Sequence, residues 1–220
     1  MGLNRKGRLS ERQEASLKNM KVVEDGKLFT SIKMDFTLAG TEMYSVILKV
    51  YKAMPKIGIN VRIQKQHEWA PENLYIPLPF SLGEASELFV EKTGNVFRPA
   101  IDQLPGTNTE FYLLQNGLAF KEEEQALLVA IKDTPLITLG TLDHHEIELC
   151  NENTHKKNKD LVYSWPMNNF WETNFKVDLS GFYEFDYQLY FVSEKQSAEQ
   201  LLEKCQELNE GLVTFPVNPE

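Results

Sequence analysis

The chain has 220 residues, of which 42% are hydrophobic and 11% aromatic, with 13 Phe, 8 Tyr and 3 Trp. This composition can fill a sizeable core, which argues against an intrinsically disordered protein. Its 23 Lys and Arg against 32 Asp and Glu leave a net charge of −9. Nucleic acid is therefore disfavoured as a partner, because phosphate binding needs a basic surface.

The cysteine count and the hydropathy pattern indicate a cytoplasmic protein. Cys150 and Cys205 are far apart and lack metal-ligand spacing. One disulfide is compatible with them, but two free thiols in a reducing compartment fit better. No apolar run approaches the length of a membrane span, and no signal-type apolar segment follows the basic first residues. We expect no membrane partner.

The first half of the chain predicts antiparallel strands. Residues 1–20 are polar and predict a linker or frayed end, with a short helix opened by Ser10 as the alternative. An Asp25-Gly26 turn then predicts a hairpin whose second strand spans 28–38. Segments 42–54 and 57–66 alternate apolar and polar residues, which is typical of an antiparallel sheet with one polar face.

The second half predicts more strands and one helix. The helix runs from Ser197, its N-cap, to Asn209 and is stopped by Gly211, with an apolar stripe on one side. We therefore expect a mainly β fold, a large antiparallel β-sandwich over 21–194 followed by a helix and tail over 195–220. The further strands are expected at 73–80, 87–92, 110–120, 125–132, 145–149, 161–165 and 183–193.

The most informative segment runs from Tyr163 to Phe175 and contains two Trp, two Phe, one Tyr and three Asn. Aromatic rings beside short amides suit a sugar, but they also suit a packed core whose amides satisfy turns. Trp165, Trp171 and Phe175 are separated from Tyr163 by even numbers of positions, which predicts that they share one face of an extended chain and point inward. We favour the core-and-turn interpretation over direct sugar contact.

This segment resembles a motif of the family-38 glycoside hydrolases, the α-mannosidases. The motif is a Ser-Trp-x-Met-Asn-Asn-x-Trp-x-Thr-Asn-Phe run in the family's C-terminal β-rich region. Three upstream segments, 73–80, 102–112 and 133–140, are similar to family segments and occur in the family's order. The positions of this chain that carry the run are Ser164, Trp165, Met167, Asn168, Asn169, Trp171, Thr173, Asn174 and Phe175.

The resemblance implies a β-sandwich of the galactose-mutarotase-like, or supersandwich, type from a bacterial-type enzyme. The family's nucleophile and zinc ligands lie in an N-terminal α/β barrel, whereas this chain has no alternating βα pattern and no His-x-Asp motif. Zinc is thus expected in the catalytic domain and no cofactor in this chain. The implied role is to support the barrel and contribute to binding mannosides, without turnover alone.

The best candidate for ligand contact is the turn at Pro105-Gly106, expected to be type II with Gly106 at positive φ. It can present Asp102, Gln103 and Thr107 to a carbohydrate from the end of a sheet. A structural turn whose Asp accepts backbone N–H groups is slightly favoured. Arg98 and Lys52 are weaker candidates for sugar hydroxyls. The motif residues expected to be structural are Trp165, Asn168, Asn169, Trp171, Thr173 and Asn174.

The histidines give little support for catalysis or metal binding. Asp143-His144-His145-Glu146 is the one His-rich cluster, but adjacent residues of a strand point to opposite faces and cannot chelate one ion. His67 is interpreted as a packing or surface residue. Two other functions stay open: a freestanding carbohydrate-binding module, and an aldose-epimerase-like enzyme that needs a His and a carboxylate in one cleft.

Overall fold

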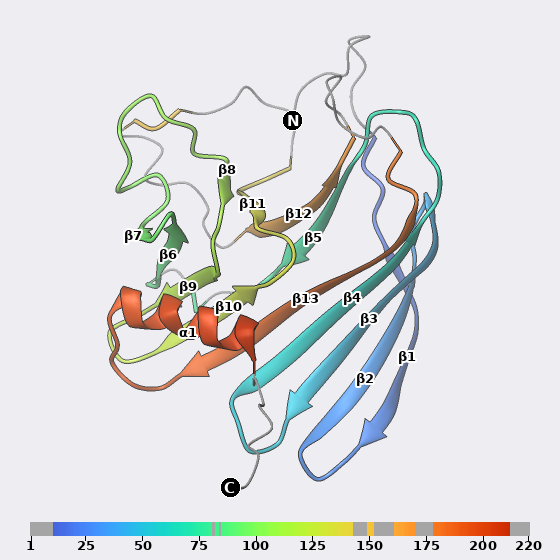
Figure 1. Ribbon diagram of the computed structural model, residues 1–220, viewed down its shortest axis with the longest axis horizontal. Helices are drawn as coiled ribbons and strands as arrows, with labels where there is room; N and C mark the ends of the chain where they lie inside the picture. Colours follow the sequence, from blue (N-terminus) through green and yellow to red (C-terminus); the bar gives the residue numbers. More distant parts are fainter. Residues whose placement is uncertain are drawn as a thin grey trace, which may run out of the picture.

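The structure is a computed structural model that describes residues 11–80, 82–83, 85–142, 149–151, 161–169 and 178–211. Its described residues form a nine-stranded sheet, a four-stranded sheet and one helix. The two sheets are antiparallel and pack face to face, and the helix lies on the outer side of the larger sheet (Figure 1). The prediction of a large β-sandwich with one C-terminal helix is confirmed.

The larger sheet, called sheet A, consists in spatial order of β1 (Ser16–Asp25), β2 (Phe29–Thr37), β3 (Thr41–Tyr51), β4 (Lys56–Lys65), β13 (Gly181–Val192), β10 (Ala126–Ile131), β9 (Gly117–Lys121), β6 (Glu87–Lys92) and β7 (Asn95–Phe97). The smaller sheet, called sheet B, consists of β5 (Asn73–Leu78), β12 (Val162–Asn168), β11 (Leu136–Leu139) and β8 (Phe111–Leu113). Strands β1 to β4 curve away from sheet B on one side of the molecule (Figure 1).

Strands β1 to β4 follow the predicted hairpins. Residues 16–20, predicted as part of a linker, instead belong to β1 and pair with the end of β2. Two register shifts, between Leu17 and Asn19 and between Val22 and Glu24, interrupt the period-two pattern of β1. Because a bulge moves the following side chains to the other face, the strand was not visible as an alternation in the sequence.

Short strands account for the other differences from the prediction. The segment predicted as one strand over 110–120 is divided into β8, in sheet B, and β9, in sheet A. Strands β7 and β11 have three and four residues, which is too short for a periodic pattern to be recognised. Of the strand predicted at 145–149, only Leu149 lies among the described residues, where it forms an isolated bridge with Asn108.

The core lies between sheet B and the middle of sheet A. Its fully buried side chains include Val61 and Ile63 on β4, Leu118 on β9 and Ile137 on β11. Both sheets contribute alternate residues, as expected for an aligned sandwich whose inner faces interdigitate.

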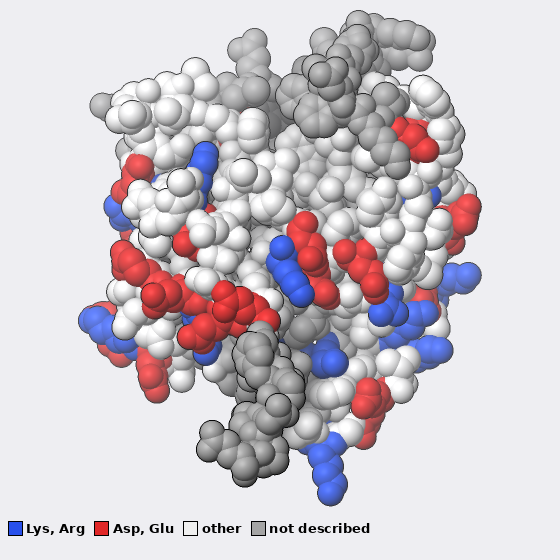
Figure 2. Space-filling model, in the orientation of Figure 1, with Lys and Arg blue, Asp and Glu red and all other residues white. Residues whose placement is uncertain are grey.

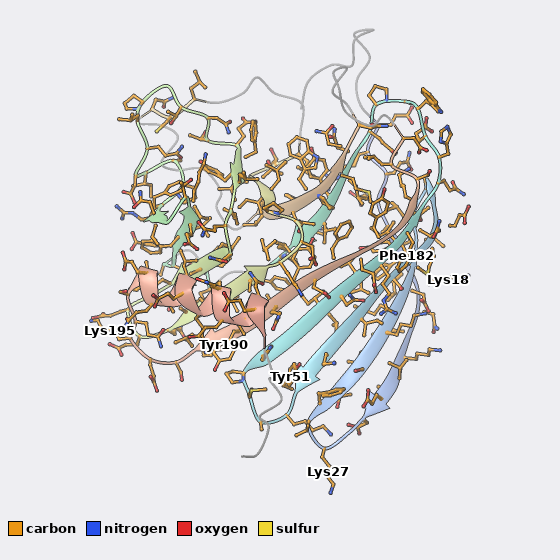
Figure 3. All side chains as sticks on the ribbon, in the orientation of Figure 1. Lys18, Lys27, Tyr51, Phe182, Tyr190 and Lys195 are labelled. Atoms are coloured by element: carbon orange, nitrogen blue, oxygen red, sulfur yellow. The ribbon has the colours of Figure 1, made fainter. Side chains whose placement is uncertain are left out.

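Helix α1 (Ala198–Glu210) covers the opposite face of sheet A. The Ser197 hydroxyl oxygen accepts a hydrogen bond from the Gln200 N–H, and Gln200 Oε1 accepts one from the Ser197 N–H, so the predicted N-cap is a complete capping box. The helix ends at Gly211. Tyr190 of β13 lies beside the helix (Figure 3), with the Lys204 Nζ 5.8 Å from its ring centroid. The buried helix residues are Ala198, Leu201, Leu202, Cys205 and Leu208.

The charged side chains give the outer surface a mixed character. Acidic residues gather over α1, which carries Glu199, Glu203, Glu207 and Glu210, while positive and negative residues are interspersed near the long hairpins (Figure 2). Lys27 marks the tip of the β1–β2 hairpin (Figure 3). Among the described residues, no helix has both the length and the apolar character that a membrane crossing needs.

Candidate functional site

The four segments on which the predicted resemblance to the α-mannosidases depends contribute the strands of sheet B. Segment 73–80 contains β5, segment 102–112 leads into β8, segment 133–140 contains β11, and β12 opens the Trp-Asn run. These strands lie side by side in the order β5, β12, β11 and β8, although they are dispersed over about half of the chain. The resemblance therefore concerns one contiguous structural unit.

Four aromatic residues of this unit, Tyr75, Phe111, Tyr163 and Trp165, lie on its outer face, whereas Tyr112 is buried in the core. The centroids of the Trp165 and Tyr75 rings are 5.3 Å apart, and Trp165 lies edge-on to Phe111 at 6.2 Å. Tyr163 contacts Tyr75 at 6.5 Å. Such tilted and edge-to-face arrangements stabilise aromatic clusters beyond the burial of their area. The Trp165 Nε1 donates to Asn73 Oδ1 at 3.2 Å, so its polar atom is also satisfied within the sheet.

The prediction that Trp165 faces the core is wrong. Trp165 and Tyr163 share a face, as their spacing predicts, but it is Val162, Ser164 and Met167 that point inward. Both sets of alternating residues in β12 contain apolar side chains, so periodicity alone did not identify the buried set. The Ser164 side chain can be buried because its hydroxyl contacts the Tyr187 hydroxyl of sheet A at 2.9 Å.

Asn169 fixes the loop that precedes β5, here called the 66–72 loop. The Asn169 side chain accepts from the Glu72 N–H at 2.6 Å and donates to the carbonyl oxygens of Glu68 and Ala70. The buried Lys65 forms an ion pair with Glu72 at 2.7 Å at the base of this loop. The turn-stabilising interpretation of Asn169 therefore agrees with its contacts. Asn168 ends β12 and lies opposite Asn73.

An exposed tryptophan lies on this fixed loop. The Trp69 side chain is 68% exposed, and the His67 ring lies edge-on to it with the centroids 5.6 Å apart. The His67 Nδ1 is 3.0 Å from Asp178 Oδ2. The Ser180 N–H also binds Asp178, and these contacts lower the pKa of the Asp178 carboxyl to about 2. His67 was predicted to be a packing or surface residue, and no sequence pattern singled out Trp69, which lies in a short polar loop.

The Asp102 carboxylate is engaged by Arg98. Two guanidinium nitrogens of Arg98 contact the two carboxylate oxygens at 2.8 and 2.9 Å, and the Arg98 backbone N–H donates to the same group at 2.9 Å. These hydrogen bonds lower the pKa of Asp102 and raise that of Arg98. Arg98 also binds Glu87 at 2.8 Å. The bidentate pair with Asp102 fixes residues 98–102, and the contact with Glu87 links this loop to β6.

Gln103 and Thr107 are also used within the turn. Gln103 Oε1 accepts from the Ala100 N–H and from the Tyr112 hydroxyl, while its Nε2 donates to the Asn108 carbonyl oxygen at 3.0 Å. Thr107 donates to the Leu104 carbonyl oxygen both from its N–H and from its hydroxyl. Gly106 has φ of 83°, as expected for a type II turn. These contacts favour the structural interpretation of the turn.

The weaker candidates are engaged as well or lie outside the described residues. Lys52 pairs with Asp25 near the tip of the β1–β2 hairpin at 2.6 Å. Within the described part of the chain, no group of three or more His, Cys, Asp or Glu side chains could hold a metal ion. The predicted positions that lie outside the described residues are Trp171, Thr173, Asn174 and Phe175 of the Trp-Asn run and the cluster Asp143, His144, His145 and Glu146.

The inner face of sheet A continues beyond its cover. A row of paired residues crosses the sheet from Tyr187 through Ile59, Leu48 and Ile32 to Val22. All five are apolar or aromatic, but Tyr187 is 1% exposed and Val22 is 60% exposed. A second row runs from Phe185 through Val61, Val46 and Met34 to Met20, and a third from Tyr183 through Ile63, Tyr44 and Phe36 to Leu17.

At the β1 end of these rows, Leu17, Met20 and Val22 are exposed, and no layer formed by the described residues covers the inner face of the sheet there. The polar residues of strands β1 to β3 lie on the opposite side, as the pairing of Lys21 with Lys33 and of Asp35 with Ser45 shows. Large contiguous patches of exposed apolar surface are typical of interaction sites and ligand-binding grooves. We call the inner face of β1 and β2 the uncovered face.

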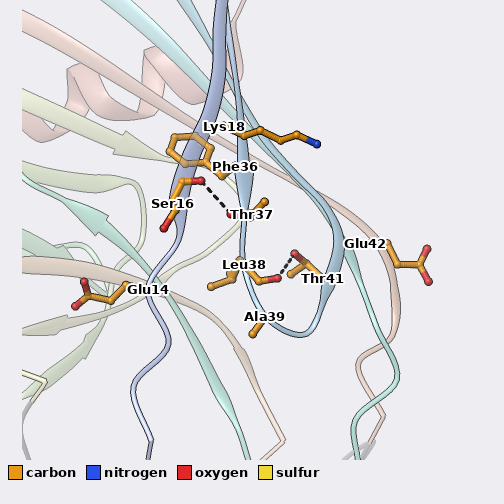
Figure 4. Close-up of a pocket in the computed structure, with 9 residues that line it drawn as sticks. All are labelled: Glu14, Ser16, Lys18, Phe36, Thr37, Leu38, Ala39, Thr41 and Glu42. Carbon is orange, nitrogen blue, oxygen red and sulfur yellow. Dashed lines mark hydrogen bonds between the residues drawn. The ribbon is translucent and has the colours of Figure 1, made fainter.

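A depression of about 400 Å³ lies at the turn between β2 and β3, next to the uncovered face (Figure 4). Its lining combines the carboxylates of Glu14 and Glu42, the ring of Phe36 and short polar side chains. The Thr41 hydroxyl and the Thr37 hydroxyl donate to backbone carbonyl oxygens, so they stabilise the turn and the strand pair. Lys18 also lines the depression, but the side chains of Glu14, Lys18 and Glu42 point away from one another (Figure 4), so they do not bring together an acid and a base beside a nucleophile.

In comparisons with known proteins, no family model matches this sequence and no curated protein shows significant similarity to it.

Proposed function

We propose that this chain is the C-terminal β-sandwich region of a cytoplasmic α-mannosidase-like enzyme of glycoside hydrolase family 38. In this proposal it packs against a catalytic barrel and has no turnover alone. The zinc chemistry would be supplied by the barrel. The residues of this chain would contribute the surface that holds the barrel in place and borders its substrate groove.

The sequence resemblance supports the family part of this proposal. Four segments occur in the family's order, and they form the four adjacent strands of sheet B. Segments that are separated in sequence but adjacent in space are expected when a resemblance reflects a common structural unit. The Arg98–Asp102 and Gln103 contacts are compatible with this role, since they would fix the turn that borders a neighbouring domain.

The observation that carries the proposal is the uncovered face. Burying apolar surface contributes about 25 cal/mol per Å², so the exposed β1 ends of the three apolar rows represent binding energy that a neighbouring domain can use. Val22 and Met20 are among the most exposed large side chains of the described residues. Their rows are continuous with the sandwich core, so the neighbour would extend an existing hydrophobic layer.

Reconstitution with the polypeptide encoded directly upstream in the same genome tests the proposal. The two parts are expected to copurify and to hydrolyse p-nitrophenyl α-D-mannopyranoside in a zinc-dependent manner, whereas this chain alone is inactive. Val22→Lys should prevent assembly because it places a charge in the apolar contact. The matched control Lys27→Met changes the tip of the same hairpin and should assemble normally.

Two results would contradict the proposal. The first is an upstream region that encodes no barrel and no polypeptide that associates with this chain. The second is a complex that forms equally well with Val22→Lys, which would show that the uncovered face is not the contact.

A further inference from the structure

The 66–72 loop presents one aromatic ring to solvent, and side-chain hydrogen bonds hold the backbone of this loop in place. Asn169 binds three backbone groups of this loop, and the Glu68 carboxylate accepts from the Ala70 N–H at 2.7 Å. The Lys65–Glu72 pair holds its base. Trp69 nevertheless stays 68% exposed. Because the loop already holds this ring in place, little further conformational entropy is lost when a ligand binds, and this favours binding.

Hydrogen-bonding groups lie directly beside this ring. The His67 ring is edge-on to Trp69, and its Nδ1 contacts Asp178. When Nδ1 carries the proton that Asp178 accepts, Nε2 of the neutral ring is an acceptor. Neither His67 Nε2 nor the Trp69 indole N–H has a hydrogen-bond partner among the described residues. Asp178 is itself fixed by the N–H and the hydroxyl of Ser180.

The chemistry of this cluster fits a sugar ring better than a protein partner. A protein hot spot is surrounded by further apolar contacts that exclude water. Trp69 is instead flanked by His67 and Glu68, and the Asp178 carboxylate contacts His67. A pyranoside has an apolar C–H face for the indole and hydroxyl groups for the polar atoms around it. Carbohydrates thus match both parts of the cluster.

We propose that Trp69, His67 and Asp178 form a surface binding site for a pyranoside, in which Trp69 stacks on the C–H face of the sugar. The His67 Nε2 and the indole N–H bind hydroxyl groups, and Asp178 positions the His67 ring. The site belongs entirely to this chain and does not depend on the proposed attachment to a catalytic barrel. It is also separate from the Asp102–Thr107 turn, whose side chains are engaged with one another.

Calorimetric titration of the purified chain tests this site. The ligands are methyl α-D-mannopyranoside, methyl β-D-glucopyranoside and methyl β-D-galactopyranoside, with the acyclic polyol mannitol as the control ligand. At least one glycoside should bind saturably with a dissociation constant on the order of 1 mM, and mannitol should not. The order of affinity among the three glycosides identifies which arrangement of hydroxyl groups the site prefers.

Variants of exposed residues locate the binding. Trp69→Ala should weaken it roughly tenfold by removing the stacking ring, and Trp69→Phe should restore part of the loss. His67→Phe should weaken binding roughly fivefold because it keeps a ring but removes the hydrogen bond. The matched control Leu104→Ala removes another highly exposed apolar side chain, on the Asp102–Thr107 turn, and should bind as the wild type does.

The thermal unfolding curve of each variant confirms that it is folded, which is expected because Trp69 contributes little buried area. The proposal is overturned if no glycoside binds saturably, if mannitol binds as well as the glycosides, or if Trp69→Ala keeps the wild-type affinity. Because the barrel is not used, none of these outcomes affects the reconstitution test.

Discussion

Asn169 and Glu72 hold each other through two reciprocal hydrogen bonds. The Asn169 N–H donates to the Glu72 carbonyl oxygen at 3.2 Å, and the Glu72 N–H donates to Asn169 Oδ1 at 2.6 Å. This pair continues the ladder between β12 and β5 past the end of both strands. It therefore connects the Trp-Asn run to the 66–72 loop, which carries the proposed sugar site.

Asn169→Ala should destabilise the protein because the Asn169 side chain is the partner of three backbone groups. Leaving the Glu72 N–H and the carbonyl oxygens of Glu68 and Ala70 without it should cost about 2 to 3 kcal/mol of unfolding free energy. Urea denaturation measures the change. Asn95→Ala removes an exposed amide and should stay within about 0.5 kcal/mol of the wild type. Equal effects of the two substitutions would contradict the role assigned to Asn169.

Much of the fold was accessible from the sequence because local signals agreed with the tertiary structure. Alternation identified β2 to β4, and the Ser197 and Gly211 signals placed α1 to within one residue at each end. The failures have physical causes. The bulges of β1 conceal its alternation, and in β12 both faces are apolar, so the buried side could be chosen only by what sheet A offers opposite it.

The candidate site was less predictable because it depends on contacts between distant segments. The Pro105-Gly106 turn was recognisable from local sequence, including the positive φ of Gly106. The sequence did not show that Asp102 binds Arg98 and that Gln103 binds Tyr112. The fold sets the positions of these partners relative to one another. The uncovered face likewise appears only when the extent of sheet B is known.

Gln103→Ala tests the structural interpretation of the predicted ligand turn. The Gln103 amide joins the Ala100 N–H, the Tyr112 hydroxyl and the Asn108 carbonyl oxygen, two of which lie next to the core. Its removal should lower the unfolding free energy by about 2 kcal/mol and leave glycoside binding unchanged. Calorimetric titration and urea denaturation of the same sample measure both. A loss of glycoside binding without a loss of stability would assign the turn to ligand contact.

The hydroxyl groups of Tyr187, Thr134 and Ser164 form a buried triangle with distances of 2.9 to 3.0 Å. Tyr187→Phe should cost about 1 to 2 kcal/mol because it leaves the other two hydroxyls with one partner fewer. Tyr51→Phe is the matched control on the rim of sheet A.

The same tyrosine predicts the alkaline stability of the fold. Burial raises the pKa of Tyr187 above its ordinary value of 10.0, and burial also raises the pKa of Tyr44. The unfolded chain therefore loses these protons first, so stability that is complete below pH 10 is lost progressively as the pH rises further. Urea denaturation between about pH 8 and pH 11 should show this decline, and Tyr187→Phe should reduce its slope. A slope that is unchanged in the variant would contradict the assignment.

Gly117 allows β9, β10 and α1 to approach one another closely. An added Cβ would overlap the Val129 carbonyl oxygen and lie 3.0 Å from the Ala130 Cα and 3.2 Å from the Cys205 Sγ. Gly117→Ala should therefore destabilise the protein by about 2 to 4 kcal/mol, since the backbone of β10 must shift. Gly58→Ala, whose nearest contact is the Lys49 Cβ at 3.6 Å, is the matched control and should be neutral or slightly stabilising. Thermal unfolding measures the change in stability of both variants, and equal changes would contradict the close approach at Gly117.

Val22 and Val61 give the most direct measure of whether the uncovered face is open in the isolated chain. Val61 is 1% exposed and Val22 is 60% exposed, although both belong to the apolar rows of sheet A. Replacement by the isosteric Thr introduces a hydroxyl, which should cost about 2 kcal/mol at position 61 and almost nothing at position 22.

In the reconstituted complex the two positions should become similar, because a neighbouring domain would bury Val22 as well. The dissociation constant of Val22→Thr from the upstream polypeptide should then rise roughly tenfold, while its unfolding in isolation is unchanged. If Val22→Thr already costs as much as Val61→Thr in the isolated chain, the face is covered there by the chain itself. In that case no part of its apolar area remains to bind a catalytic barrel.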